Sequence, residues 1–230
     1  MEIKIRELIE SDEAVVKDMC INGIRNNLAH RTAMCFIKSK GFLTFLVLIL
    51  AILYSICGAS IALGISFLIF PCIAYYLCKL YIHWEAYADN NTATDTDISM
   101  YQYWTRPEVP TMKLWVALVG SEIAGCVAVR PSNVTSLLKT DPIEYEPDKT
   151  RAALERMYVF DKWRGKRIGL RLLQHAIQFC ESHGFREIEI VTSTLQNEAK
   201  TLYEKHGFET QRSRKLFFGY NFRLDMVKTL

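Results

Sequence analysis

The chain has 230 residues, half of them hydrophobic, and a formal net charge of +3. This length allows one domain with a substantial core and an additional segment. The basic residues are locally concentrated, which favours a local anionic ligand and argues against nonspecific nucleic-acid binding. The seven cysteines include no C-x-x-C pair and no zinc-ligand spacing. We therefore expect reduced thiols and no metal site.

The first residues predict a strand followed by a helix. Residues 3–8 alternate apolar and polar side chains, as a half-buried strand does, and Ser11 or Asp12 is expected to cap the helix that follows. We assign residues 1–28 to the first part of a folded domain. Residues 29–41 are then a basic linker.

The most apolar stretch runs over residues 42–78, which are 37 residues without Asp, Glu, Lys, Arg or His. A single helix of this length would extend about 55 Å, whereas the hydrocarbon core of a bilayer is about 30 Å thick. Gly58 and Gly64 near its middle favour a turn. We predict a two-helix membrane hairpin over residues 42–82. One buried helix is the alternative, but a domain of this size cannot cover so much apolar surface.

The organisation of the chain around this insert predicts an even number of membrane crossings. Residues 1–28 and 83–230 must lie on one side of the bilayer if they form one domain, which a hairpin or a re-entrant loop permits. Basic residues on both sides of the insert place these parts in the cytosol by the positive-inside tendency. Glycosylation triplets that begin at Asn90 and Asn133 favour the opposite, lumenal orientation.

Beyond the insert, the pattern predicts a helix and a β-hairpin. Asp95 or Asp97 is expected to cap the helix. Two alternating runs, Lys113 to Val119 and Glu122 to Arg130, flank a Gly-Ser pair, which is typical of two antiparallel strands joined by a turn.

Residues 154–173 predict a strand, a turn that contains Gly165 and Gly169, and a helix. The first amides of a helix have no partner within it, the helix dipole adds positive charge, and glycine lets a phosphate approach the main chain. Five basic residues occupy the same turn: Lys162, Arg164, Lys166, Arg167 and Arg171. The pattern indicates a ligand with several phosphates, and acidic lipid headgroups are the competing partner.

The last part of the chain continues the alternation of strand and helix. Glu187 to Thr192 predicts a strand, and Thr194 is expected to cap a helix that carries Asn197 and Tyr203. Two further antiparallel strands, over residues 208–214 and 217–227, then close the domain.

Two of these segments resemble the motifs of a known superfamily. Residues 164–169, RGKRIG, resemble the R/Q-x-x-G-x-G/A pyrophosphate loop of the GNAT superfamily of N-acetyltransferases. Residues 197–208, NEAKTLYEKHGF, resemble its fourth-helix signature, N-x-x-A-x-x-L-Y-x-x-x-G-F. Each motif is generic, but their order and spacing together are specific. Arg167 replaces the usual middle glycine, where a side-chain contact can substitute for an amide contact.

The resemblance implies an α/β (α+β) GNAT fold, in which helices flank a mixed, splayed central sheet. Here the inserted two-helix membrane hairpin would interrupt that fold. The placement of the insert, with the residues around it, resembles the camello subfamily of membrane-bound N-acetyltransferases. This resemblance implies an endoplasmic-reticulum membrane enzyme that moves acetyl from acetyl-CoA to an amine, with the catalytic domain in the cytosol.

The resemblance also implies the residues of the site. Tyr203 would be the acid that protonates the leaving thiolate, and Glu155 would be the base that accepts the amine proton. The coenzyme would meet the main chain of Met157, Tyr158 and Val159, the phosphate loop of Arg164, Gly165, Lys166, Arg167, Ile168, Gly169 and Leu170, and the side chain of Asn197. Each of the three side chains also has a purely structural alternative. Tyr203 would then be a core aromatic, Glu155 a solvent-facing carboxylate and Asn197 a helix-capping residue.

The acceptor follows neither from composition nor from spacing. A small amino-acid-like amine, in particular a cysteine S-conjugate, is the reading that we favour, with direct attack in a ternary complex. Protein lysine is the alternative acceptor, and aspartate or a catalytically inactive membrane adaptor are further ones. The electrostatic sign of the acceptor groove should discriminate between a lysine chain and a carboxylate. Arg130, Arg212, Arg214 and Lys215 are unranked candidates for holding such a carboxylate.

Overall fold

A computed structural model describes residues 2–20, 99–132, 150–216 and 220–230, together with 44, 47–48, 51–52 and 54–55. The predicted linker over residues 29–41, nearly all of the hairpin over 42–82 and both glycosylation triplets lie outside these ranges. Within the described residues, no helix combines the length and apolar character that a membrane crossing requires.

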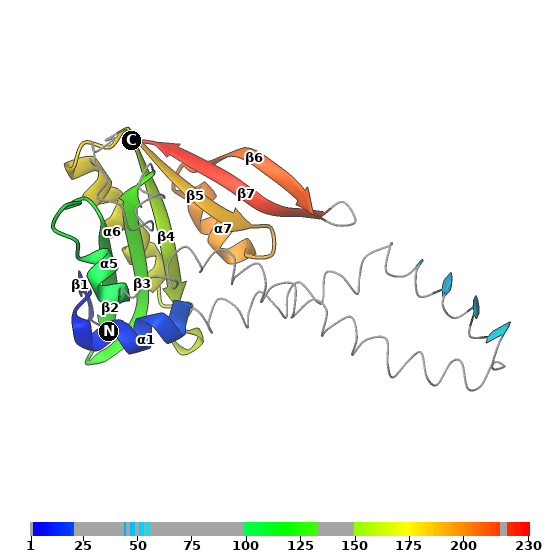
Figure 1. Cartoon of the computed structure of the whole chain (residues 1–230), viewed down its shortest axis with the longest axis horizontal. Helices are drawn as coiled ribbons and strands as arrows, with labels where there is room; N and C mark the ends of the chain where they lie inside the picture. Colours follow the sequence, from blue (N-terminus) through cyan, green and yellow to red (C-terminus); the bar gives the residue numbers. More distant parts are fainter. Residues whose placement is uncertain are drawn as a thin grey trace.

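The described part of the chain forms a mixed seven-stranded sheet in the order β1-β2-β3-β4-β5-β7-β6 (Figure 1). Neighbouring strands are antiparallel except β4 and β5, which are parallel. The strands are β1 (Ile3–Glu7), β2 (Lys113–Val119), β3 (Glu122–Pro131), β4 (Arg151–Val159), β5 (Glu187–Ser193), β6 (Glu209–Leu216) and β7 (Tyr220–Thr229). The mixed sheet that the resemblance implies is therefore confirmed.

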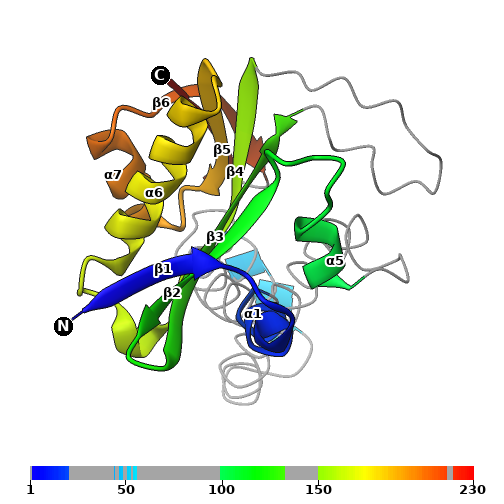
Figure 2. The same cartoon turned by 90° about the vertical axis from the view of Figure 1, so that its left-hand side faces the viewer.

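Helices cover the sheet from both sides (Figure 2). α6 (Ile168–Ser182) and α7 (Asn197–Lys205) lie on one face, and α1 (Glu13–Asp18) and α5 (Met100–Trp104) lie on the other. A buried apolar cluster fills each interface: Leu172, Leu173 and Tyr203 belong to the first, and Val16 and Trp104 to the second. The alternation of side chains along the strands supplies both clusters.

The parts before and after the insert belong to one folded unit. β1 pairs with β2 over five residue pairs, from Ile3 opposite Val119 to Glu7 opposite Trp115. The carboxylate of Glu13 on α1 accepts a hydrogen bond from the amide of Met100 on α5 at 2.6 Å. The chain thus leaves the described domain after residue 20 and returns at residue 99 on elements that contact each other. This arrangement satisfies the premise from which an even number of crossings follows.

β4 changes its pairing halfway along its length. Its first four residues pair with β5, ending at Leu154 opposite Ile190, while β5 continues beside β7 as far as Ser193. Figure 1 shows β4 and β5 diverging beyond this point. The β3–β4 register shifts between Cys126 and Ala128, and Arg156 has a φ of 54°. An extra residue in this left-handed conformation is a β-bulge, which leaves its own backbone groups outside the ladder.

The bulge also decides which side chains face which helices. Leu154 before it and Met157 and Val159 after it all contact the cluster under α6, whereas Tyr158 and Phe160 contact the cluster under α1 and α5. Strict alternation would send Met157 to the opposite face, because the side-chain period of a strand is two residues. One inserted residue therefore restores the orientation that places Met157 opposite α7.

Two predicted helix caps are wrong, and a third is right in position only. Ser99, rather than Asp95 or Asp97, caps α5, and its hydroxyl accepts a hydrogen bond from the amide of Gln102 at 3.1 Å. Asp12 holds the capping position of α1 as expected, but its carboxylate accepts from no α1 amide; it accepts from the Ile9 amide at 3.1 Å and pairs with Arg6. The capping position of α7 is held by Gln196, not Thr194. Cap-forming residue types recur every few positions here, so propensity alone does not select one.

Candidate active site

The predicted phosphate loop connects β4 to α6. A short 3₁₀ turn, Asp161–Trp163, follows β4, and α6 begins at Ile168. Gly165 has a φ of 75°, and a Cβ built on it would have no atom within 4 Å. The loop therefore leaves open space next to the main chain just before the unpaired amides at the start of α6. This is the arrangement that binds phosphate groups.

Arg167 has a backbone conformation that glycine adopts more readily than arginine. Its φ is 61° and its ψ 16°, which is left-handed, and it occupies the capping position of α6, where its carbonyl accepts from the Arg171 amide at 3.1 Å. A residue with a Cβ adopts this conformation at a cost of about 1–2 kcal/mol. The loop thus holds a non-glycine residue in a conformation that favours glycine, and the arginine side chain is exposed.

The basic side chains of the loop fall into two groups. Lys162 pairs with Glu122 at 2.5 Å and Arg164 with Asp161 at 2.8 Å. Lys166, Arg167 and Arg171 are exposed and have no carboxylate partner within the described ranges. The positive charge of the second group is therefore uncompensated and available to bind a polyanion. The positions of these residues in the sequence did not distinguish the two groups.

Arg164 sits over the edge of β4 where the coenzyme arm is expected. Its Nε donates to the carbonyl of Val159 at 3.3 Å, and its guanidinium carbon lies 5.7 Å from the centre of the Tyr158 ring. Residues 157–159 have no strand partner on the side away from β3 in the described part of the chain. A strand edge of this kind accepts an extended ligand as an added strand.

Tyr203, the predicted acid, lies on α7 with its hydroxyl directed at β4. The residue is 5% exposed, and its Oη donates to the Sδ of Met157 at 3.6 Å. Burial raises the pKa of the Tyr203 phenol well above its ordinary value. The phenol is therefore protonated at neutral pH, which is the state that an acid needs. Its only described hydrogen-bond acceptor is a weak one, a thioether.

Three parts of the predicted site meet at Gly169. A Cβ built on this residue would lie 3.5 Å from Cε of Met157, 3.7 Å from Leu202 and 3.7 Å from Val159. The start of α6, the edge of β4 and the face of α7 that carries Tyr203 are thus adjacent. Asn197 is exposed at the first position of α7, and no described contact ties it to the loop.

Glu155, the predicted base, lies on the opposite face of β4 and is held by an arginine. Its Oε1 accepts from Nη2 of Arg130 at 2.6 Å, and the exposed fractions of the two side chains are 36% and 11%. Arg130 also donates to the carbonyls of Pro131 and Ser132. Burial lowers the pKa of Arg130, but the hydrogen bond and the charge of Glu155 outweigh it and raise the pKa.

Residues from three other segments lie around Glu155. Arg130 on β3 pairs with it, and Tyr103 on α5 lies in the electrostatic range of both; burial raises the pKa of the Tyr103 phenol. Glu189 on β5 lies in the electrostatic range of Arg130 and accepts a hydrogen bond from the Ser132 hydroxyl. Sequence reasoning did not find this group, because no motif links positions so far apart; only the strand register brings them to one face.

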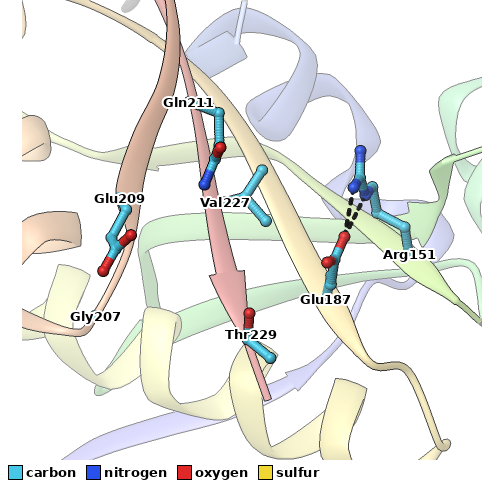
Figure 3. Close-up of a pocket in the computed structure, with 7 residues that line it drawn as sticks. All are labelled: Arg151, Glu187, Gly207, Glu209, Gln211, Val227 and Thr229. Atoms are coloured by element: carbon cyan, nitrogen blue, oxygen red, sulfur yellow. Dashed lines mark hydrogen bonds and ion pairs between the residues drawn. The ribbon is translucent and has the colours of Figure 1, made fainter.

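An open depression lies elsewhere, over the ends of β5, β6 and β7 (Figure 3). Glu209, Gln211, Val227 and Thr229 line it together with the Arg151–Glu187 ion pair. None of the predicted site residues belongs to it. The coenzyme edge of β4 and this depression are therefore different places on the sheet.

The chain matches the model of the acetyltransferase (GNAT) family over residues 79–208, more than half of its length. It belongs to this family and is an acetyl-CoA-dependent N-acetyltransferase. The residues fit that coenzyme: an open glycine-containing loop, three uncompensated cations and an unpaired strand edge adjoin one another.

Its relatives include mouse N-acetyltransferase 8, which is 26% identical over 210 residues, or 90% of this chain and 84% of the relative. A probable N-acetyltransferase camello from Xenopus tropicalis is 32% identical over 98 residues, or 43% of this chain and 39% of the relative. A solved GNAT-family acetyltransferase from Staphylococcus aureus Mu50 has a TM-score of 0.56 at 13% identity, and the match covers 100% of this chain and 99% of that chain. This last likeness concerns the fold alone.

Proposed function

We propose that the acceptor is a small amino-acid-like amine, in particular a cysteine S-conjugate. The observation that carries the proposal is the charge pattern of the sheet face around Glu155. There Arg130 pairs with Glu155, and the Tyr103 phenol lies in the electrostatic range of this pair and of the guanidiniums of Arg106 and Arg156. Glu189 lies in the electrostatic range of Arg130, so cations and carboxylates stand side by side. A face that alternates both signs suits a molecule with an ammonium and a carboxylate group. A lysine side chain, which carries only a cation, would favour an acidic face.

In this proposal the coenzyme lies along the β4 edge between the diverging strands. The main-chain groups of Met157, Tyr158 and Val159 pair with its pantetheine arm, and residues 164–170 hold its pyrophosphate. Lys166, Arg167 and Arg171 supply the positive charge, and Asn197 contributes from the start of α7. Arg164 exchanges its hydrogen bond to the Val159 carbonyl for a phosphate contact, since a guanidinium binds phosphate more strongly than a neutral carbonyl.

The reaction proceeds by direct attack of the amine in a ternary complex. Acetyl-CoA supplies the acetyl thioester. Glu155 accepts the proton of the amine, directly or through a water molecule, and Arg130 fixes the orientation of its carboxylate. Tyr203 donates a proton to the departing thiolate from the other side of the strand; its buried phenol holds that proton until the thiolate develops.

We also propose that residues 42–82 anchor the enzyme in the endoplasmic-reticulum membrane with the catalytic domain in the cytosol. The 37 uncharged residues and the basic flanks support this location. The contact between α1 and α5 supports an even number of crossings. Protease protection of the C-terminus in sealed microsomes tests the orientation: a digested C-terminus is expected, and a protected one would place the domain in the lumen.

A panel of amines tests which acceptor the enzyme prefers. The purified full chain is incubated with acetyl-CoA and S-benzylcysteine, aspartate or a lysine-containing peptide, and products are measured by mass spectrometry. S-benzylcysteine is expected to be acetylated with the highest kcat/KM, and its methyl ester, which lacks the carboxylate, to react more slowly. Preference for the lysine peptide would overturn the acceptor assignment and leave the acetyltransferase activity intact.

A further inference from the structure

Two cysteines that the reaction does not use lie together behind the bulge of β4. Sγ of Cys20, two residues beyond α1, is 4.0 Å from Sγ of Cys126 on β3, although 106 positions separate them in the chain. Both are buried, at 5% and 0% exposure. Cys180, the remaining cysteine of the described residues, lies in the cluster on the opposite face of the sheet.

The pair is tied to the bulge by a hydrogen bond. The Cys126 thiol donates to the carbonyl of Arg156 at 3.0 Å. A bulge residue has no place in the strand ladder, so its carbonyl needs another donor, and the thiol provides it. Arg156 separates Glu155 from Met157, so this one contact supports the backbone between the proposed base and the proposed pantetheine edge.

We propose that Cys20 and Cys126 are a site of reversible disulfide formation that controls the bulge. Peroxide is the oxidant. Cys20 keeps a small exposed fraction and Cys126 keeps none, so Cys20 reacts first and Cys126 resolves the product. The contact with Cys126 and the nearby guanidinium of Arg156 lower the pKa of the Cys20 thiol, which favours the thiolate as the attacking form.

The chemistry balances with one peroxide. The Cys20 sulfur attacks one peroxide oxygen, the O–O bond breaks, and hydroxide leaves and takes up the thiol proton as water. The Cys126 sulfur then attacks the sulfenic sulfur of Cys20, the S–O bond breaks, and a second water leaves with the Cys126 proton. The two thiols lose two electrons in total, and the peroxide is reduced to two molecules of water.

Disulfide formation changes the bulge in two ways. The Cys126 proton is consumed, so the Arg156 carbonyl loses its donor. The sulfur atoms must also approach from 4.0 Å to the bonded distance of about 2.05 Å. This movement draws α1 and β3 together directly beneath Arg156. We expect it to displace Glu155 and the β4 edge and to slow acetyl transfer.

Peptide mapping of the purified full chain tests the proposal without reference to activity. The protein is treated with hydrogen peroxide, the remaining thiols are alkylated, and the digest is analysed with and without dithiothreitol. A cross-linked peptide pair that contains Cys20 and Cys126, about 2 Da lighter than the sum of the two thiol peptides, is expected and should disappear on reduction. Absence of this pair after peroxide treatment overturns the proposal, even if the chain acetylates none of the amines tested.

Measurements of acetyl transfer then test whether the disulfide controls the bulge, and this part rests on the proposed function. Loss of acetyl transfer should follow the cross-linked fraction and be reversed by dithiothreitol. Cys20→Ser should resist the reversible loss, whereas Cys180→Ser, the matched buried control, should lose activity as the wild type does. A cross-linked enzyme that is fully active would refute control while leaving the disulfide assignment in place.

Discussion

The two halves of β4 share one strand but have opposite surroundings. Before the bulge, Ala152, Ala153 and Leu154 pair with neighbours on both edges and are at most 4% exposed. After it, Tyr158 and Val159 pair only with β3, and residues 156–159 are half-buried. The paired half fixes the sheet and the open half is available to a ligand. A single inserted residue, Arg156, separates scaffold from binding edge, and changes on either side should therefore have different consequences.

The largest effect is expected beyond the bulge, at Tyr203. Tyr203→Phe removes only the hydroxyl that Met157 accepts from, so the fold should persist while kcat falls about 10²- to 10⁴-fold, the range for a lost general acid. Coenzyme affinity, measured by calorimetry, should be unchanged. Tyr101→Phe on α5 is the control for loss of a hydroxyl. A Tyr203→Phe enzyme with wild-type kcat would remove the phenol from the mechanism.

The raised pKa of Tyr203 gives this residue a pH signature. Because burial favours the neutral phenol, ionisation begins above the ordinary tyrosine value of about 10. Ionisation of Tyr203 should therefore cause no decline in kcat as the pH rises from 7 to about 10. An alkaline decline in kcat that begins near pH 8 and disappears in Tyr203→Phe would show that the phenol ionises much earlier than its burial requires.

Glu155→Gln should have the next largest effect. The amide can still accept from Arg130, so the geometry is retained, but the side chain no longer accepts the amine proton. We expect kcat to fall about 10²-fold at neutral pH and to recover partly at alkaline pH, where more of the amine is already uncharged. Glu187→Gln, which alters an ion pair on the scaffold side, is the control. An unchanged pH profile would count against Glu155 as the base.

Substitutions of Arg156 address the boundary itself. Valine is strained at a φ of 54° because it is β-branched, whereas glycine is not. Arg156→Val should destabilise the fold by about 1–3 kcal/mol and weaken acetyl-CoA binding. Arg156→Gly should retain both stability and binding. Both variants lose the guanidinium, so equal behaviour in thermal unfolding and calorimetry would show that backbone strain at the bulge is unimportant.

The phosphate loop offers the same comparison on a smaller scale. Arg167→Ala and Arg167→Gly remove the same charge, but only alanine keeps a Cβ at a φ of 61°. The strain of alanine is already present in the free loop, so the two variants should bind acetyl-CoA with equal dissociation constants, whereas Arg167→Gly should exceed Arg167→Ala by about 1 kcal/mol in the free energy of unfolding. Tighter binding by Arg167→Gly in calorimetry would mean that the loop takes the left-handed conformation only when it binds.

The smallest effect on activity is expected in the scaffold, at Asp12. Burial raises the pKa of this carboxyl, but the hydrogen bonds from Arg6 and the Ile9 amide outweigh it and lower the pKa. The stabilisation is therefore present at neutral pH and is lost as the pH falls through the lowered value, below about 4. Asp12→Asn should lower the free energy of unfolding by about 1–3 kcal/mol at pH 7, with little change in kcat. Glu10→Gln, at an exposed neighbour, is the control; a difference that does not shrink as the pH falls below about 4 would exclude the ion pair as its cause.

The sequence predicted most of the sheet because alternating strands such as residues 113–119 and 122–130 carry their own signal. It also predicted the positions of Gly165 and Tyr203, which local motifs mark. It did not predict the bulge, since an arginine at position 156 gives no sign of a positive φ. The Arg130–Glu155 pair and the Cys20–Cys126 contact depend on strand register and helix packing, so no local pattern reveals them.

Hydrogen exchange on β4 with and without acetyl-CoA tests the central claim most directly. If the bulge separates scaffold from binding edge, the coenzyme should slow exchange of the amides of residues 157–159 and of the loop over 164–170. Residues 152–154, already paired on both edges, should exchange at the same slow rate with and without the coenzyme. Slowing confined to other strands, with residues 157–159 unchanged at saturating coenzyme, would contradict the account.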